Sequence, residues 1–314
     1  MELAAAQPHP TSSDISVSQD QIRNELVSVL SRQTENQEGA IETAIEGLLL
    51  AKVCCSTGPI AGIQQPALSV MVKGSKQVSI GNESYRYDPF HYMVSTADLP
   101  VTARVTLTHE SEPSLGLKLL LDSKEISLLL SDENLPPIDK QQDVKGIQIH
   151  RLGQDLLDPL TRLIKLLETP EDIPILAPLI KREIFYRLLR AGQGKQLQQM
   201  ILQDGHVNRI ARVLHLLHDN YHQPLKVDEL AKQAHMSVSA LHHHFKSFTA
   251  ISPLQYHKNL RLQEARRLIL STDQGVAAVA RAVGYESPSQ FSREYRRLFD
   301  VPPAQEKHKW AKQA

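Results

Sequence analysis

The chain has 314 residues with 35 Lys/Arg and 35 Asp/Glu, so its formal net charge is zero. This length fits two domains of ordinary size. The two cysteines, Cys54 and Cys55, are adjacent, which excludes a disulfide framework and indicates a reducing compartment. The N-terminal residues lack the basic and apolar stretches of a signal peptide, and the apolar runs are too short or too interrupted to span a bilayer. We therefore expect a soluble, cytoplasmic protein.

The neutral total hides an asymmetry between the two halves of the chain. Residues 206–314 carry 16 Lys/Arg, 9 Asp/Glu and ten of the 14 histidines, which leaves residues 1–205 with a net charge of −7. A basic module joined to an acidic one is typical of a polyanion-binding half next to a half with another role. Chance surface charge would give the same balance, so charge alone does not decide.

The first residues predict little regular structure. Residues 1–19 are rich in Pro, Ser, Thr and Ala and predict a disordered tail. A short helix is expected over residues 21–34, with an apolar face formed by Ile22, Leu26, Val29 and Leu30.

Strand signals dominate the next part of the chain. Short β-rich segments bounded by turn residues cover residues 67–72, 76–80, 84–87, 91–96, 101–108 and 115–121. The Gly81-Asn82 step is expected to form a tight hairpin turn. Six such strands at this spacing predict a small antiparallel barrel or sandwich.

Helical periodicity begins after about residue 152. It places Leu156, Leu160, Leu163 and Leu167 on one apolar stripe. The stripe either packs on the strands or forms a dimer seam. We expect a dimer through the helix that carries these four leucines. A further helix is expected over residues 178–190. The segment AGQGK, residues 191–195, predicts a flexible break and hence a domain boundary near residues 192–205.

The basic half contains an internal repeat at an offset of 50 residues. SVSALHHHFKSFTAISPLQ starts at Ser237, and SPSQFSREYRRLFDVPPAQ starts at Ser287. Apolar positions match apolar ones and polar positions match polar ones, as in the pair Phe245 and Tyr295. One supersecondary unit is therefore used twice.

Each copy has the pattern of a helix-turn-helix unit. In the first, residues 227–234 form a short helix, His235-Met236 make the turn, and Ser237 is an N-cap. In the second, Gly284 supplies the turn and Ser287-Pro288 begin the next helix. The polar face of that next helix is typical of a helix that enters the major groove of DNA. A solvated face of a helical bundle would explain one copy, but two copies in the basic half favour DNA binding.

Residues 210–305 resemble the AraC/XylS family of bacterial transcription regulators. The most specific segments are LAKQAHMSVSALHHHFK, ISPLQYHKNLRLQEARRLIL and VAAVARAVGYESPSQFSREYRRLFDVPP. The resemblance implies two helix-turn-helix units, held by a central helix, that dock into successive major grooves. Its base-facing positions correspond to Ser239, His242 and His243 in the first unit and to Pro288, Ser289, Gln290 and Arg293 in the second. Lys246 and Arg296, which match in the repeat, complete the expected DNA-binding residues.

One residue departs from the family pattern, because His235 stands where the family has Gly at the turn. Since His tolerates a positive φ better than most residues, we expect some strain rather than a lost turn.

The strand-rich half resembles the AraC-type N-terminal regulatory family. The segments that carry this resemblance are PALSVMVKGSKQVSIGNESYRYDPFHYMVSTADLPVTARV and SEPSLGLKLLLD. The resemblance implies a cupin-like barrel followed by a helical dimerisation element. The expected fold is therefore α+β: a cupin-like antiparallel β-barrel with its helical dimerisation element over residues 20–192, and an all-α domain with two helix-turn-helix units over residues 206–314.

Catalytic and metal-binding patterns are missing from the sequence. The adjacent residues His242, His243 and His244 cannot converge on one metal, because successive helical side chains point about 100° apart. The strands lack a His-x-His cluster, and no nucleophile motif, phosphate loop or pair of acids is evident. We therefore predict no metal, no cofactor and no enzymatic activity.

A small-molecule pocket inside the barrel is expected instead. Its candidate residues are Met71, Tyr85, Tyr87, His91, Tyr92 and Leu107. Cys54 and Cys55 are expected to be buried, inert thiols.

The sequence thus predicts a sequence-specific DNA-binding transcription regulator whose barrel senses a small-molecule effector. The alternative is an architectural or repressor-type DNA binder whose barrel only dimerises, and an enzyme with an incidental basic domain ranks third. The expected partners are double-stranded DNA, an unidentified effector, a second copy of the chain and RNA polymerase, with no membrane.

Overall fold

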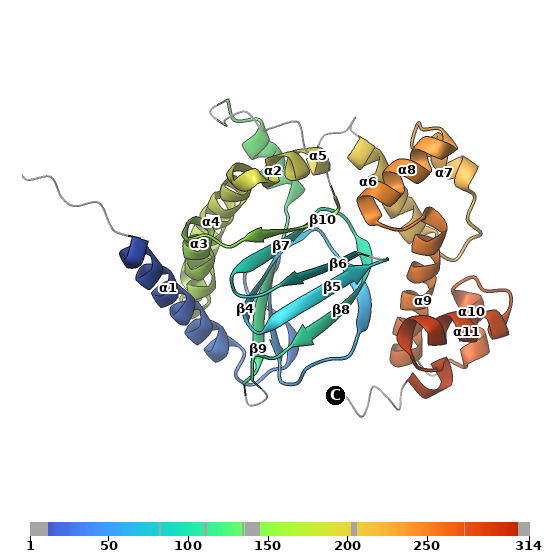
Figure 1. Ribbon diagram of the computed structural model, residues 1–314, viewed down its shortest axis with the longest axis horizontal. Coiled ribbons are helices and arrows are strands. Elements are labelled where there is room, and N and C mark those ends of the chain that lie inside the picture. Colours follow the sequence, from blue (N-terminus) through green and yellow to red (C-terminus); the bar gives the residue numbers. More distant parts are fainter. Residues whose placement is uncertain are drawn as a thin grey trace, which may run out of the picture.

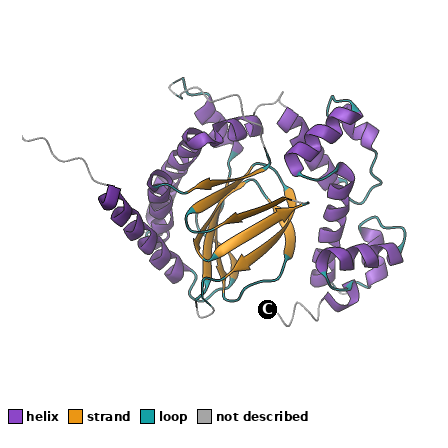
Figure 2. Ribbon diagram, in the orientation of Figure 1, coloured by secondary structure: helices purple, strands orange, loops and turns teal. Residues whose placement is uncertain are grey.

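The computed structural model describes residues 12–81, 83–109, 112–133, 135, 145–201, 206–272 and 274–306. The strands lie in the middle of the molecule and helices flank them on both sides (Figures 1 and 2). Helices from the N-terminal half cover one side, and the helices of the C-terminal half lie against the other. The expected α+β class is confirmed.

Two antiparallel sheets form the central layers. The larger sheet has the order β1 (Gly39–Glu42), β2 (Leu48–Val53), β9 (Ser114–Leu120), β4 (Ala67–Lys73), β7 (His91–Ser95) and β10 (Ile147–Arg151). The smaller has the order β3 (Ile60–Gln64), β8 (Leu99–Thr106), β5 (Ser75–Ile80) and β6 (Glu83–Tyr87). All six predicted strands are present. The expected closed barrel is not formed, because the strands belong to two separate sheets that face each other. Two facing antiparallel sheets are still consistent with a cupin-like fold.

The β5–β6 hairpin confirms the predicted tight turn. Ile80 pairs with Glu83, so only Gly81 and Asn82 connect the two strands. Gly81 has a φ of 58°, a left-handed conformation that suits Gly and a two-residue turn. Asn82 itself lies outside the described residues.

Helices α1 (Ser12–Gln33), α3 (Gln154–Lys165) and α4 (Ile173–Leu188) cover the outer face of the six-stranded sheet. Leu26 and Leu30 of α1 join Leu160 and Leu163 of α3 in one buried core. Shorter elements complete this half: α2 (Ser123–Leu130), η1 (Leu166–Glu168) and η2 (Pro170–Asp172).

The leucine stripe therefore does not form an exposed dimer seam. Leu156, Leu160 and Leu163 are buried within their own chain, and Leu167 packs on the same core. Helix α1, whose sequence lies more than a hundred residues earlier, covers the stripe. The alternative interpretation, packing inside the monomer, is the one that the structure supports.

Two expectations about irregular segments are wrong. Residues 12–19, expected to belong to a disordered tail, are part of α1, while residues 1–11 lie outside the described residues. The expected break at residues 191–195 is helical: α4 passes through a π-helical turn (Leu189–Gln193) into α5 (Gly194–Ile201). The helical backbone therefore continues through the two glycines of this segment. Because Leu197 of α5 is buried in the N-terminal core, the first domain extends at least to Ile201.

The C-terminal half is all helical, as predicted. A first unit contains α7 (Val227–Gln233) and α8 (Val238–Thr249), and a second contains α10 (Val276–Ala282) and α11 (Pro288–Phe299). Helix α9 (Pro253–Ser271) joins the units, α6 (His206–Asp219) precedes them, and η4 (Pro303–Gln305) follows. Among the described residues, no helix is both long and apolar enough to cross a membrane.

The two domains pack against each other through the smaller sheet. Val78 and Ile80 of β5 share a buried cluster with Phe248 and Ile251, which end the first unit. Hydrogen bonds also cross this interface: Tyr256 Oη to Asp98 O (2.8 Å), Gly146 N to Phe248 O (3.0 Å) and Gln263 Nε2 to Gly62 O (3.1 Å).

Candidate functional site

Helix α8 presents a polar face that is free of the core. Leu241 and Phe245 are fully buried, whereas Ser239, His242 and His243 are exposed. Ser237 caps the helix by accepting a hydrogen bond from Ala240 N (3.2 Å), as predicted. The same helix carries exposed Lys246 one turn further on.

Helix α11 repeats this arrangement in the second unit. Phe291 and Tyr295 are buried, and the opposite face exposes the predicted residues Pro288, Ser289, Gln290, Arg293 and Arg296. Ser287 caps the helix and Pro288 occupies its first turn. All nine predicted DNA-binding side chains are therefore accessible on two equivalent helices, and they form a basic, hydrogen-bonding surface.

The three adjacent histidines do not form a metal site. His243 and His244 contact each other edge to face, with ring centroids 5.3 Å apart. No group of three or more His, Cys, Asp or Glu side chains in the described part of the chain is arranged to hold a metal ion.

The turns of the two units differ by one residue. His235 (φ 52°) and Gly284 (φ 88°) both adopt positive φ values, and Met236 N and Tyr285 N then bond to equivalent carbonyls in the preceding helices. The second turn has an extra residue, Glu286, before its cap. His235 thus keeps the turn in a left-handed conformation, as expected.

Sequence reasoning missed one residue of this surface, Glu294. Its carboxylate accepts hydrogen bonds from Lys258 Nζ (3.0 Å), Tyr285 Oη (2.8 Å) and Gln290 Nε2 (3.1 Å). Burial opposes ionisation, but the hydrogen bonds from Gln290, Lys258 and Tyr285 outweigh it, so the pKa of Glu294 lies below its usual value. The spacing of four residues between Gln290 and Glu294 was the available signal.

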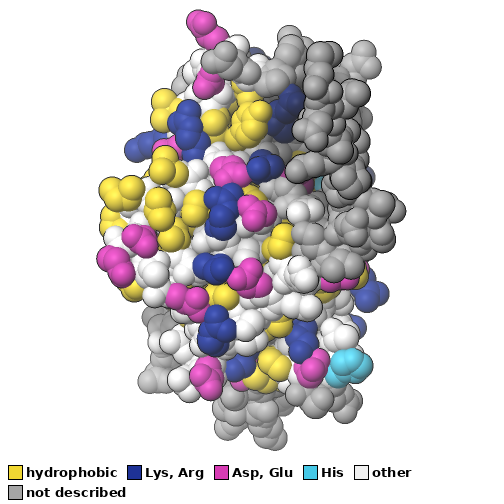
Figure 3. Space-filling view, turned by 90° about the vertical axis from the view of Figure 1, so that its left-hand side faces the viewer, with side chains coloured by type: hydrophobic (Ala, Val, Ile, Leu, Met, Phe, Trp, Pro, Cys, Tyr) yellow, Lys and Arg dark blue, Asp and Glu magenta, His cyan; other side chains and the backbone are white. Residues whose placement is uncertain are grey.

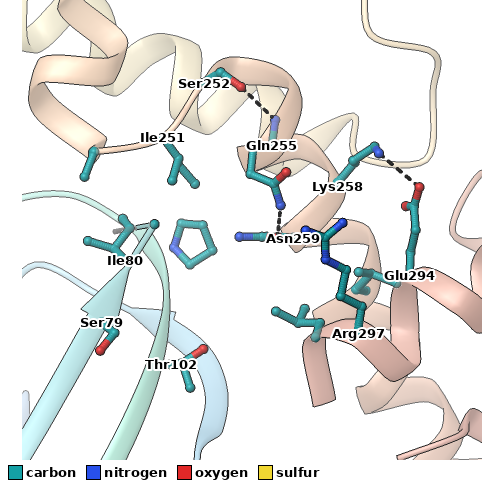
Figure 4. Close-up of a pocket in the computed structure, with 15 residues that line it drawn as sticks. Ser79, Ile80, Thr102, Ile251, Ser252, Gln255, Lys258, Asn259, Glu294 and Arg297 are labelled. Carbon is teal, nitrogen blue, oxygen red and sulfur yellow. Dashed lines mark hydrogen bonds and ion pairs between the residues drawn. The ribbon is translucent and has the colours of Figure 1, made fainter. Parts of the chain in front are cut away.

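A cavity of about 500 Å³ lies between the two domains (Figure 4). It brings together the β5–β6 turn, β8, the turn after α8, the central helix α9 and the recognition helix α11. Its lining residues are Ser79, Ile80, Gly81, Pro100, Thr102, Ala250, Ile251, Ser252, Gln255, Lys258, Asn259, Leu262, Glu294, Arg297 and Leu298.

The wall of this cavity is apolar on one side and charged on the other. Ile80 and Ile251 meet across the domain interface, while Lys258 is paired with Glu294. Arg297 extends from α11 toward Asn259 and makes no ion pair with another described residue (Figure 4). The cavity therefore offers an uncompensated positive charge beside an apolar wall.

The six residues predicted to line a pocket inside the barrel do not meet in one place. Met71, Tyr85 and Tyr87 lie in the core that faces the smaller sheet. Tyr92 belongs to the opposite, helix-covered face and stacks on His150. Neighbouring strand residues alternate between faces, which is why the segments could not be assigned to one pocket without their register.

The remaining two predicted pocket residues lie at the rim. His91 Nδ1 contacts Asp88 Oδ1 (2.8 Å) at a partly exposed position, and Leu107 follows the end of β8. Neither lines the interdomain cavity.

The cysteines are exposed, not buried as expected. They follow β2 at the end of the sheet. Partial desolvation and the nearby carboxylate of Glu38 raise the pKa of the Cys54 thiol, which disfavours its reactive thiolate form.

Two family models match the chain. The model of the AraC-type transcriptional regulator N-terminus matches residues 44–196, and a helix-turn-helix domain model matches residues 230–309. The first match covers strands β2 to β10 and helices α2 to α4, whereas α1 and β1 precede it. The second covers both recognition helices.

Curated relatives are similar over part of the chain. The transcriptional activator RhaS of Escherichia coli is 27% identical over 165 residues, which is 52% of this chain and 59% of RhaS. The transcriptional regulator CdhR of Pseudomonas aeruginosa is 32% identical over 135 residues, which is 43% of this chain and 40% of CdhR. The alignments thus span about half the length of the relatives, and these relatives are transcription regulators rather than enzymes.

Among solved structures, wild-type ToxT from Vibrio cholerae with a bound unsaturated fatty acid has a TM-score of 0.52 and 12% identity. The match covers 83% of this chain and 94% of ToxT, and at this identity it concerns the fold. The fold, the repeated recognition helices and the two family matches together show that the chain belongs to the AraC/XylS family of DNA-binding transcription regulators.

Proposed function

We propose that this regulator binds specific DNA sites under the control of a small molecule held in the interdomain cavity. The observation that carries the proposal is the composition of the cavity wall. Residues from the sheet, the central helix and the second recognition helix line a single space. A ligand there would touch the smaller sheet, the turn after α8, the helix α9 that joins the two units, and α11. It could therefore influence how the two units are placed relative to each other.

The chemistry of the wall favours an organic acid with an apolar body. Arg297 would pair with an acidic group, and Ile80 and Ile251 would contact the apolar part. A volume of about 500 Å³ lies within the range of small-molecule sites, roughly 300–1,000 Å³. The fatty acid in the structure of ToxT supports the idea that this fold can hold such a compound.

The nine exposed side chains of α8 and α11 are the proposed DNA contacts. Residues in the first turns of a recognition helix reach base edges, so Ser239, Gln290 and Arg293 are the proposed base readers. Lys246 and Arg296, further along each helix, are proposed to contact phosphate.

A second candidate function, DNA binding with a domain that only dimerises, is favoured by one surface. Ile175, Leu176 and Leu179 of α4 are 70%, 39% and 61% exposed. Apolar side chains gather among charged ones on the side of the molecule shown in Figure 3. This α4 surface, rather than the buried stripe of α3, is the proposed contact with a second copy of the chain. A contact with RNA polymerase also remains a proposal.

Salt dependence tests the DNA-binding part of the proposal. With roughly six phosphate contacts, the affinity for duplex DNA should fall by about three orders of magnitude between 50 and 200 mM salt. A flat response in a binding titration would contradict phosphate recognition by this surface.

Thermal shift of the full chain with oleate, an unsaturated fatty acid, tests the effector part. Oleate should raise the melting temperature, and Arg297→Met should reduce that shift. Arg267→Met is the matched control, because Arg267 is an exposed cation of α9 that pairs with Glu264 outside the cavity. No specific stabilisation by oleate or by a broad library of organic acids would favour the dimerisation-only alternative.

A further inference from the structure

The side chain of Gln290 is held by Glu294 of the same helix. The two residues are one turn apart on α11, and Gln290 Nε2 lies 3.1 Å from Glu294 Oε1. A carboxylate can only accept hydrogen bonds, so the NH₂ side of the amide must face Glu294. One N–H and the oxygen Oε1 of Gln290 remain available at the exposed end.

Glu294 is itself fixed from two other elements. Lys258 of α9 donates to Oε1, and the hydroxyl of Tyr285 in the preceding turn donates to Oε2. The carboxylate is only partly exposed, and the ring of Tyr285 is buried in the core of the second unit. The orientation of the Gln290 amide is therefore set by a network that reaches the helix core.

The first unit has no equivalent arrangement among its described residues. At the offset of 50, Gln290 corresponds to Ala240 and Glu294 corresponds to His244. An alanine offers no side-chain hydrogen bond, so this network distinguishes the second unit.

We infer that Glu294 is a positioning residue for DNA readout, because it fixes which edge of the Gln290 amide the second unit presents to a base. The inference rests on the proposed base contact of Gln290. The free N–H and Oε1 form the donor–acceptor pair that a glutamine uses to contact adenine N7 and N6. A bidentate contact of this kind discriminates between bases by about 5- to 150-fold.

The same network connects Gln290 to the interdomain cavity, because Lys258 and Glu294 both line the cavity wall. A group in the cavity that attracts Lys258 would remove one of the three hydrogen bonds that hold the Glu294 carboxylate. Base preference in the second half of the site would then depend on what occupies the cavity.

The test compares base preference in four variants of the full chain. A randomised duplex library first selects the preferred site of the parent chain, and titrations then use this site and its single-base variants. Gln290→Ala should lower discrimination at one base position by about fivefold or more. Glu294→Ala should lower discrimination at the same position, and the double variant should be no worse than Gln290→Ala. Glu294→Gln keeps an acceptor for the amide and should restore most of the preference.

The outcomes separate the inference from the base contact on which it rests. If Gln290→Ala leaves the base preference unchanged, the proposed contact and the inference both fail. If Gln290→Ala changes it but Glu294→Ala only weakens all sequences equally, Glu294 has a structural role and the inference alone is overturned. Failure of Glu294→Gln to restore preference overturns it as well. Glu264→Ala, which removes another carboxylate of this domain away from α11, is the control and should keep the parent preference.

Discussion

The turn of the second helix-turn-helix unit should not tolerate a side chain at Gly284. Its φ is 88°, and a Cβ atom added there would lie 2.1 Å from the backbone oxygen of His222. The backbone around His222 is held in place, because Arg261 donates hydrogen bonds to the carbonyl oxygens of Tyr221 (2.6 Å) and Gln223 (2.8 Å) on either side of it.

The free-energy cost of Gly284→Ala follows from these contacts. A left-handed backbone costs a non-glycine residue about 1–2 kcal/mol. Moving residues 221–223 also strains hydrogen bonds from a charged donor, each worth about 1.5–3 kcal/mol. We expect a loss of at least about 3 kcal/mol, which is a large part of the 5–15 kcal/mol that usually stabilises a domain. The second recognition helix should lose its position and the DNA affinity should fall to that of the first unit alone.

The reciprocal change, His235→Gly, should stabilise the first unit. His235 is exposed, and its backbone forms hydrogen bonds: His235 N donates to Lys232 O (3.0 Å), and its backbone oxygen accepts from Arg209 Nη1 (3.1 Å). A glycine keeps both. Glycine removes the left-handed strain of about 1–2 kcal/mol but adds about 0.5–1 kcal/mol of unfolded-state entropy. A net gain of about 0.5–1 kcal/mol remains, with DNA affinity unchanged.

Amide hydrogen exchange measures both effects within the full chain, because it reports the free energy of local opening in each unit. Protection should fall over α10 and α11 in Gly284→Ala and rise over α7 and α8 in His235→Gly. Unchanged protection in Gly284→Ala would refute the steric argument. Lower protection in His235→Gly would show that its imidazole makes a stabilising contact.

Three further predictions concern base readout, acid stability and assembly. Arg293→Ala should cost about 1–3 kcal/mol and relax preference at one base pair, because Arg matches guanine O6 and N7. The equivalent change His243→Ala should cost less, because an imidazole offers fewer donors than a guanidinium, and titrations on single-base variants check this. Equal weakening on all sequences would make Arg293 a phosphate contact. Burial, and then the charge of Arg261, lower the pKa of His257 to about 4. The stability of the folded chain that depends on neutral His257 is therefore complete above pH 6.5 and falls by up to about 3 kcal/mol as the pH decreases toward 4. In urea unfolding, the stability of His257→Gln should depend less on pH than that of the parent chain, and an identical pH dependence would contradict this prediction. Leu176→Glu with Leu179→Glu should convert a dimer to a monomer in sedimentation, whereas a parent chain that is monomeric at micromolar concentration rejects the α4 surface.

Patterns with a short period were predictable from the sequence, whereas contacts between distant segments were not. The alternation in residues 67–72 and 115–121 marked β4 and β9, and the repeat from Ser237 and Ser287 marked both recognition helices. Strand β1 (Gly39–Glu42) has only four residues, mostly exposed, and β3 (Ile60–Gln64) contains a glycine and also carries little burial pattern. Such edge segments have too few buried positions to give a periodic signal.

An apolar stripe reveals that a helix is covered but not by which surface. The stripe of α3 was compatible with a dimer contact, which we expected, and with packing inside its own chain, and α1 decides for the latter. The cavity was harder still, because its wall joins Ser79 to Leu298, which no local pattern connects. The spacing of Gln290 and Glu294 could be seen in the sequence. The hydrogen bonds of Glu294 with Lys258 and Tyr285 could not, because only the tertiary fold brings these residues together.

The hydrogen bonds across the domain interface are comparable in free energy to the coupling that the proposed control by a small molecule requires. At least three hydrogen bonds cross it, and each is worth about 0.5–1.5 kcal/mol net. Regulatory coupling between two binding sites is commonly about 1–3 kcal/mol, equivalent to a 5- to 150-fold change in affinity. A ligand that rearranges the contacts of Tyr256 and Gln263 with the sheet can therefore supply coupling of this size without unfolding either domain. Because both residues belong to α9, which joins the two units, such a rearrangement acts on both recognition helices at once.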